Sequence, residues 1–258
     1  MIHLKPEHFI PFVDQLANAS GQIIRTYYKK DIPYEVKEDL SPVTEADKEV
    51  ERALRALILA AYPGHGVIGE EFEASNPEAE YQWYIDPIDG TKSFMIGRPI
   101  FGTLISLVKG DLPILGVIDQ PILGERWSGV RGFATDFNSR VTEARGCPTL
   151  AQAVLCTTSP NLFVGDDYKK FEKIRKKAHY TVYGGDCYSY GLIASGRVDI
   201  VVETGLKPHD FIALKPIIEG AKGIITDWEG NPITPKSDGR VIACGDRRVH
   251  REALKLVK

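Results

Sequence analysis

Residues 86–91, Asp-Pro-Ile-Asp-Gly-Thr, place two carboxylates three positions apart across a turn. The apolar run 83–85 before them predicts a buried strand that delivers Asp86 at its end, and the proline is expected to end the strand pairing. Asp86 and Asp89 can then converge on one point, together with the backbone carbonyl of Ile88 between them. Carboxylate and carbonyl oxygens are the ligands that Mg²⁺ prefers, so this segment is a candidate magnesium site.

The same segment supplies hydrogen-bond donors. Gly90 and Thr91 open a short helix that we expect to run through Phe94, so their backbone N–H groups lie at its start. Such N–H groups bind phosphate, and together with a magnesium site they are what phosphoryl transfer requires. Taken alone, an Asx turn followed by a capped helix explains these residues equally well.

Other acids stand at the ends of predicted elements. Glu70 and Glu71 follow a short apolar strand, where they repel each other unless a cation or a donor neutralises them. Asp210 precedes an apolar helix, and Thr44 with Asp47 resembles a capping box in which Asp replaces Glu. Each has an ordinary interpretation as a surface turn or a helix cap. Together they place acids at the ends of helices and strands, which is where ligand-binding sites commonly lie in such folds.

The elements that position these acids follow from hydrophobic spacing. In the first half it predicts helices at 6–28 and 44–62 and strands at 67–68, 83–85, 101–108 and 114–118. In the second half it predicts strands at 154–157, 181–183, 198–202, 223–227 and 241–244, and helices at 167–177, 188–194, 210–221 and up to about 256. We therefore expect an α+β half at 1–147 that carries the 86–91 motif, and an α/β half at 148–258 that completes the site.

Composition argues against several other classes of protein. Hydrophobic residues at 43% and charged residues at 26% are ordinary globular values, which disfavours disorder. The net charge is −3, and the basic residues cluster only at 169–177, as on the solvated face of a helix, so we expect no nucleic-acid partner. No apolar run is long enough for a bilayer, and residues 1–20 lack the apolar stretch of a signal peptide. We expect a cytoplasmic protein with no membrane partner.

Four separated blocks resemble the inositol monophosphatase family in order and spacing, over roughly residues 37–228. The blocks are Lys37-x-Asp39-x-Ser41-Pro42-Val43-Thr44-x-x-Asp47, Gly69-Glu70-Glu71, the segment 86–91, and Asp210 before Glu219-Gly220-Ala221-Lys222-Gly223. The resemblance implies a layered αβαβα sandwich, a homodimer, two or three Mg²⁺ ions, inhibition by lithium, and hydrolysis of a phosphate monoester of a small molecule.

The resemblance also implies roles for individual residues. The first ion would be held by Glu70, Asp86 and the carbonyl of Ile88, and the second by Asp86, Asp89 and Asp210. The catalytic group would comprise Glu70 and the pair Asp47 and Thr91, in which Thr91 is hydrogen-bonded to Asp47 and orients the attacking water. The N–H groups of Gly90 and Thr91 would bind the phosphate.

Within the family, the chain is similar to the histidinol-phosphate phosphatase branch. The pointers are the segments 91–94, 97–104, 185–188, 206–210 and 225–228. His209 is a departure, because the family commonly has Trp, and this branch often Tyr, before the metal-binding Asp. Histidinol phosphate carries an ammonium and an imidazole, so we predict that Asp186 and Glu203, both at strand ends, bind the substrate. Their ordinary interpretations are a helix cap and the start of a loop.

Three alternatives remain open from the sequence. The substrate can be inositol monophosphate, a sugar phosphate or a 3′-phosphorylated nucleotide. The chain can be a non-catalytic module that binds Mg²⁺ or Li⁺, although Asp47 and Thr91 argue against it. A structural role in an RNA-associated complex is disfavoured by the acidic balance.

Overall fold

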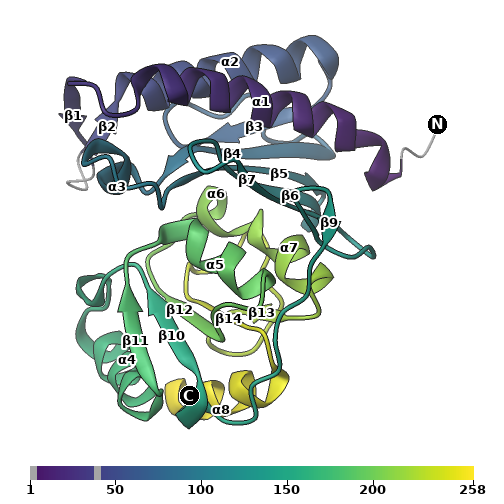
Figure 1. Cartoon of the computed structure of the whole chain (residues 1–258). Coiled ribbons are helices and arrows are strands. Elements are labelled where there is room, and N and C mark those ends of the chain that lie inside the picture. The colour runs from purple at the N-terminus through teal and green to yellow at the C-terminus, as the bar shows by residue number, and fades with distance from the viewer. Residues whose placement is uncertain (1–4, 38–41) are drawn as a thin grey trace.

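Two β-sheets alternate with three layers of helices, in the order helix, sheet, helix, sheet, helix (Figure 1). The computed structural model describes residues 5–37 and 42–258. The expected αβαβα sandwich is thereby confirmed. In the part of the chain that is described, no helix combines the length and the apolar character needed to cross a membrane.

The first sheet has seven strands in the order β3-β4-β5-β6-β7-β8-β9. They are β3 (Gly66–Gly69), β4 (Tyr81–Asp89), β5 (Gly102–Lys109), β6 (Leu112–Gln120), β7 (Glu125–Val130), β8 (Asp136–Phe137) and β9 (Arg140–Val141). Only β3 and β4 pair in parallel; the other neighbours are antiparallel. The last three strands were not predicted, because they are short or carry polar residues.

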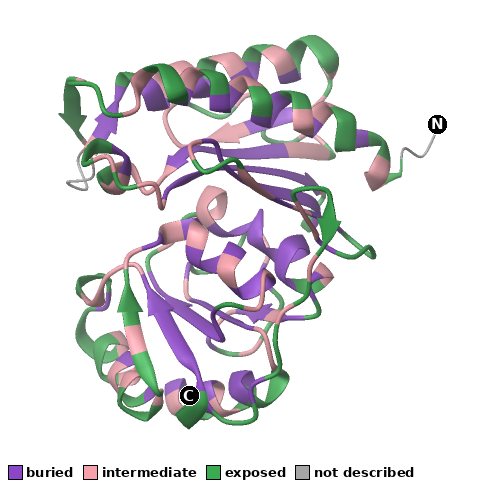
Figure 2. Cartoon of the chain, viewed as in Figure 1, coloured by how far each residue is buried: buried purple, intermediate pink, exposed green. Residues whose placement is uncertain are grey.

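Two long helices, α1 (Ile10–Tyr27) and α2 (Glu45–Ala61), cover the outer face of this sheet (Figure 1). A 3₁₀ turn, η1 (Pro6–Phe9), precedes α1, and a small hairpin of β1 (Tyr34–Val36) and β2 (Pro42–Thr44) connects the two helices. Both helices bury one apolar stripe, as the helical spacing predicted, and Figure 2 shows this stripe turned toward the sheet.

The second sheet has five strands in the order β11-β10-β12-β14-β13. They are β10 (Val154–Thr157), β11 (Tyr180–Tyr183), β12 (Ile200–Glu203), β13 (Ile224–Thr226) and β14 (Val241–Cys244). The outer helices are α4 (Gly165–Lys177) and α8 (Arg247–Val257), with the 3₁₀ turns η2 (Leu150–Gln152) and η3 (Pro160–Leu162) beside them. All strands of the first sheet precede residue 142 and all strands of the second follow residue 153.

Three short helices form the middle layer between the sheets (Figure 1). They are α5 (Asp186–Ala194), α6 (Pro208–Phe211) and α7 (Leu214–Gly220), and a further short helix, α3 (Thr91–Met95), follows β4. The middle layer lies very close to the first sheet: a Cβ on Gly116 would stand 2.0 Å from the carbonyl oxygen of Ala213, and one on Gly129 would stand 2.4 Å from the amide nitrogen of Ile217. The two halves therefore share one core, and a division at 147/148 stays a prediction.

Two expectations about local structure were wrong. Pro87 does not end its strand: β4 continues to Asp89, with a register shift between Asp86 and Asp89 that accommodates the missing N–H group. The helix expected at 210–221 is broken into α6 and α7. Pro216 explains the break, because its ring would clash with the carbonyl of Ile212 in a continuous helix.

Candidate active site

A hollow of about 260 Å³ lies between the two sheets, where β3, β4 and β12 end. It is lined by nine of the ten residues that the sequence singled out as site residues: Glu70, Asp86, Ile88, Asp89, Gly90, Thr91, Asp186, Glu203 and Asp210. The tenth, Asp47, reaches the hollow through Thr91. The fold therefore brings together residues from both halves of the chain.

The irregular end of β4 supplies the centre of this hollow. Asp86 is 2% exposed, and its Oδ1 has no hydrogen-bond partner among residues 5–37 and 42–258. Asp89 Oδ2 accepts a hydrogen bond from the backbone N–H of Cys187 at 2.5 Å. Gly90 then adopts a φ of +93°, which favours glycine, and a Cβ there would also stand 2.9 Å from Asp186 Oδ2.

Burial and mutual repulsion perturb these carboxyl groups. Burial raises the pKa of Asp86 well above its ordinary value, and the charges of Glu70, Asp89 and Asp210 raise it further. Burial does the same to the pKa of Asp89, aided by Asp186 and Asp210. The pKa of Asp210 is also raised by burial, although His209 partly offsets this. Such a cluster of acids is stabilised by a bound cation.

The donor set fits a hard divalent cation. Its oxygens come from carboxylates and from the Ile88 carbonyl, and the buried Asp86 Oδ1 lacks a hydrogen-bond partner among the residues that the structure describes. Glu70 is at present neutralised by Lys37, whose Nζ lies 2.6 Å from Glu70 Oε1 and 2.7 Å from Glu71 Oε1. In the described residues, no three His, Cys, Asp or Glu side chains lie close enough together to hold a metal ion as they stand. To join such a donor set, Glu70 would have to exchange Lys37 for the cation.

Asp47 and Thr91 link α2 to the start of α3. Asp47 Oδ2 accepts hydrogen bonds from the Thr44 amide at 2.8 Å and the Thr44 hydroxyl at 2.6 Å, so the expected capping box is formed. Its other oxygen, Oδ1, accepts a longer hydrogen bond from Thr91 Oγ1 at 3.4 Å. Burial raises the pKa of Asp47 to about 6. Asp39 and Ser41 of the same sequence block lie outside the described residues.

The wall formed by the second half carries two further acids. Asp186 is the first residue of α5 and adopts a φ of 43°; the N-cap is Gly185, so the interpretation of Asp186 as the cap was wrong. Glu203 ends β12 and is 3% exposed. Burial raises the pKa of Asp186 to about 6, against the lowering effect of Thr158 and of the cations Arg98 and Lys92. Burial raises the pKa of Glu203 to about 7.

Both oxygens of Glu203 already accept hydrogen bonds. Oε1 accepts from the amide of Thr158 at 3.0 Å and from its hydroxyl at 2.5 Å, and Oε2 accepts from Tyr190 at 2.9 Å. Asp186 is therefore the more available of the two acids for a ligand. Sequence reasoning missed Thr158, Tyr190 and the Cys187 amide, since no local pattern marks residues that act through a partner 13 to 98 positions away.

Asp210 is not the N-cap of a helix, as its ordinary interpretation required. It lies inside α6, and its Oδ2 accepts a hydrogen bond from the amide of Lys207 at 2.7 Å. The ring of His209 is adjacent, with Nε2 3.3 Å from Asp210 Oδ1. The unusual histidine of the sequence thus contacts a carboxylate of the site.

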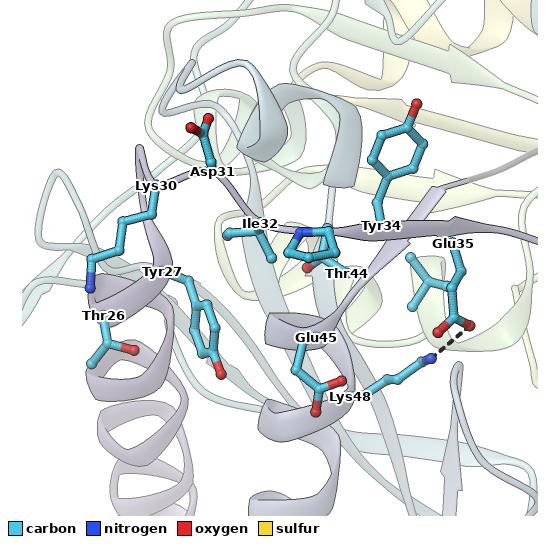
Figure 3. A pocket seen from close by; sticks show the side chains of 12 residues that line it. Thr26, Tyr27, Lys30, Asp31, Ile32, Tyr34, Glu35, Thr44, Glu45 and Lys48 are labelled. Carbon is cyan, nitrogen blue, oxygen red and sulfur yellow. Dashed lines mark ion pairs between the residues drawn. The ribbon is translucent and has the colours of Figure 1, made fainter.

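A second hollow, of about 640 Å³, lies between the end of α1 and the start of α2 (Figure 3). Its charged side chains are of both signs, and Glu35 forms an ion pair with Lys48 at 2.8 Å, which the figure marks. Among the described residues, the buried side-chain atoms without a partner belong to Asp86, Gln120 and Thr157, and none of these lines this hollow. This hollow therefore lacks the buried, unpartnered carboxylate oxygen that marks the carboxylate site.

The raised carboxyl pKa values predict how stability depends on pH. Asp47, Glu71, Asp186 and Glu203 have folded-state pKa values of about 6 to about 7, above their values of 3.8 and 4.5 in a free chain. A carboxyl whose pKa is raised by folding holds its proton more tightly when folded, so it favours folding at low pH and this contribution is lost as the pH rises through the folded pKa. In a chelator, the melting temperature should therefore fall between about pH 4 and about pH 7.

A divalent cation should raise the melting temperature more at pH 8 than at pH 5, because it competes with protons for the same oxygens. Differential scanning calorimetry at several pH values, with chelator or with Mg²⁺, measures both effects. A melting temperature that rises with pH across this window in chelator would contradict the electrostatic account.

The model of the inositol monophosphatase family matches residues 5–258. A bifunctional phosphatase IMPL2, chloroplastic, of Arabidopsis thaliana is 46% identical over 258 residues, which cover 96% of this chain and 75% of the relative. A histidinol-phosphatase of Chlorobaculum parvum is 34% identical over 231 residues, which cover 89% of each chain.

Solved structures agree with these matches. An inositol monophosphatase from Zymomonas mobilis superposes with a TM-score of 0.90 at 46% identity, covering 97% of this chain and 98% of the other. An IMPase from Thermotoga maritima superposes with a TM-score of 0.85 at 27% identity, covering 96% of each chain. From its sequence and its fold, the chain belongs to the inositol monophosphatase family and is a phosphoric monoester hydrolase.

Proposed function

We propose that the chain hydrolyses L-histidinol phosphate to L-histidinol and phosphate, with Mg²⁺ as its cofactor. The observation that carries the proposal is Asp186, an acid at the wall of the hollow that is not tied to any described partner by a close side-chain ion pair. An ammonium substituent on the substrate matches this acid, whereas the neutral hydroxyls of inositol do not require it. Relatives named as histidinol-phosphatases support the same substrate.

In this proposal the carboxylates of the hollow hold Mg²⁺. Glu70, Asp86 and the Ile88 carbonyl are assigned to one ion, and Asp86, Asp89 and Asp210 to a second. Bound there, Mg²⁺ would lower the pKa of a water molecule and stabilise charge on the leaving oxygen. The number of ions, two or three, and inhibition by lithium follow from the family resemblance.

The chain's own residues would orient the reactants. Thr91, whose hydroxyl donates to Asp47, would accept a hydrogen bond from the attacking water and fix its direction. Gly90 is the N-cap of α3 and Thr91 is its first residue, and their amides would bind phosphate oxygens. Asp186 would receive the substrate ammonium, and Glu203 would keep Thr158 and Tyr190 in place behind it.

A second candidate substrate is myo-inositol phosphate, because the protein from Zymomonas mobilis with 46% identity is named an inositol monophosphatase. The deciding experiment is release of inorganic phosphate from L-histidinol phosphate, myo-inositol phosphate and a bisphosphorylated nucleotide, compared by kcat/KM. A preference for inositol phosphate would refute the histidinol assignment and leave the phosphatase chemistry intact.

We further propose a cytoplasmic homodimer, with the α+β half 1–147 and the α/β half 148–258 both contributing to each site.

Asp89→Asn should lower kcat/KM at least about a hundredfold, equivalent to roughly 3 kcal/mol of barrier, because it removes charge from a carboxylate assigned to a metal ion. Activity should also vanish in chelator and return with Mg²⁺. Asp166→Asn is the matched control, since its side chain is 76% exposed on α4, and it should behave as wild type. Wild-type turnover of Asp89→Asn at the same Mg²⁺ concentration would rule out this assignment.

If Asp47 and Thr91 orient the water as one unit, their alanine variants should have non-additive effects on kcat, with the double variant hardly worse than either single one. Loss of the cap alone would cost about 1 kcal/mol of stability. Asp246→Ala removes a comparable N-cap from α8, whose first turn it bonds, and should lower the melting temperature without affecting kcat. Full activity in folded Asp47→Ala would leave this residue with only its capping role.

Asp186→Asn should lower kcat/KM for histidinol phosphate about ten- to a hundredfold, because a hydrogen bond to a charged group contributes roughly 1.5–3 kcal/mol. Asn tolerates the left-handed backbone of this position as well as Asp does, so the fold should be unaffected. Activity on glycerol phosphate, which has no ammonium, should barely change. Equal losses on both substrates would mean that Asp186 is structural.

A further inference from the structure

A buried ion pair on α2 lies behind the loop that carries Glu70. Glu51 is fully buried and Arg55, one helical turn later, is 9% exposed. Arg55 Nε donates to Glu51 Oε1 at 2.7 Å. Removing two charges from water opposes folding, so a buried pair is weak evidence for a contribution to stability and calls for another explanation.

Both members of the pair bind the backbone of that loop. Glu51 Oε2 accepts a hydrogen bond from the Glu71 amide at 2.7 Å, and Oε1 accepts one from the Phe72 amide at 3.3 Å. Arg55 donates to the Phe72 carbonyl at 2.9 Å and to Ser75 Oγ at 3.3 Å. These bonds satisfy both backbone groups of the residue two positions after Glu70.

The loop also approaches Glu51 as closely as a backbone can. A Cβ at Gly69 would stand 2.0 Å from Glu51 Oε1, so only glycine fits before Glu70. Glu70 thus lies between a contact at Gly69 and a hydrogen bond at Glu71, and both contacts are made by the same carboxylate. Its backbone position is therefore set by Glu51.

Asp47, Glu51 and Arg55 are spaced by four residues and share one face of α2. The first contacts Thr91 and the other two hold the loop. Asp47 and Glu51 are separated by about 6 Å along the helix axis, because a helix rises about 1.5 Å per residue. One rigid helix therefore sets the distance between the Asp47–Thr91 pair and Glu70.

We propose that Glu51 and Arg55 are positioning residues, which hold Glu70 at the distance from Asp47 and Thr91 at which a divalent cation binds. This inference rests on the assignment of Glu70 as a metal ligand. It is independent of which phosphate ester is the substrate.

The test measures Mg²⁺ binding without substrate, by isothermal titration calorimetry, and kcat with glycerol phosphate at saturating Mg²⁺. Glu51→Ala should raise the dissociation constant of Mg²⁺ about tenfold and change kcat at saturation less than about threefold, because the ligands remain present but are less well placed. Glu51→Gln keeps one of the two oxygens that accept the loop amides, which is enough for the Glu71 amide, so it should recover part of the affinity. If Glu51→Ala does not fold, Arg55→Lys serves instead. It keeps a positive charge beside Glu51 but loses the guanidinium hydrogen bonds to the Phe72 carbonyl and Ser75 Oγ. We expect it to raise the dissociation constant of Mg²⁺ about threefold.

Val50→Ala is the matched control for lost stability. Val50 is fully buried on the same helix but packs into the apolar core, so the variant should melt at a lower temperature with unchanged Mg²⁺ affinity. Unchanged affinity in Glu51→Ala, or an equal loss in Val50→Ala, would overturn the positioning role.

If Glu70→Gln binds Mg²⁺ as the wild type does, the assignment of Glu70 and this inference both fail. If the wild type ignores histidinol phosphate while Glu51→Ala shows the weakened binding, the substrate is wrong and the positioning role stands.

Discussion

Repulsion among buried carboxylates is the constraint on which the rest of this structure depends. Asp86 and Asp89 from β4, Asp210 from α6 and Glu70 from the end of β3 face one hollow, and burial raises the pKa of the first three. Negative charges that are both close together and removed from water oppose folding until a cation is bound. The charge of Glu70 is balanced by Lys37, whereas Asp86 Oδ1 has no hydrogen-bond partner in the described part of the chain.

Irregular backbone is what allows the acids to meet. The register shift in β4 allows both of its carboxylates to face the hollow, although residues three positions apart in a regular strand face opposite sides. Pro216 breaks the helix between α6 and α7, so α6 ends at Phe211, the residue after Asp210. Glycine at position 90, with its positive φ, lets the chain start α3 beneath Asp186. Each irregularity interrupts a regular element at the level of the site.

Rigid packing then holds these segments in place. The backbone of the middle layer contacts the first sheet directly at Gly116 and Gly129, so the acids of α6 and β4 cannot drift apart. On the opposite side of the sheet, α2 carries Asp47 at its start and the Glu51–Arg55 pair one and two turns later. In this five-layered fold the first sheet positions Asp86 and Asp89, the second sheet positions Glu203, and α2 positions Asp47.

The sequence by itself determined the local parts of this arrangement. The amphipathic helices, the capping box of Thr44 and Asp47 and the acids of segment 86–91 are encoded by neighbouring residues, whose periodicity and turn chemistry are visible without a fold. Tertiary structure decided the rest: that Lys37 neutralises Glu70, that Glu203 is bound by distant hydroxyls, and that β4 continues past its proline. These features depend on contacts between residues far apart in the chain, and such contacts exist only once packing has brought separate elements together.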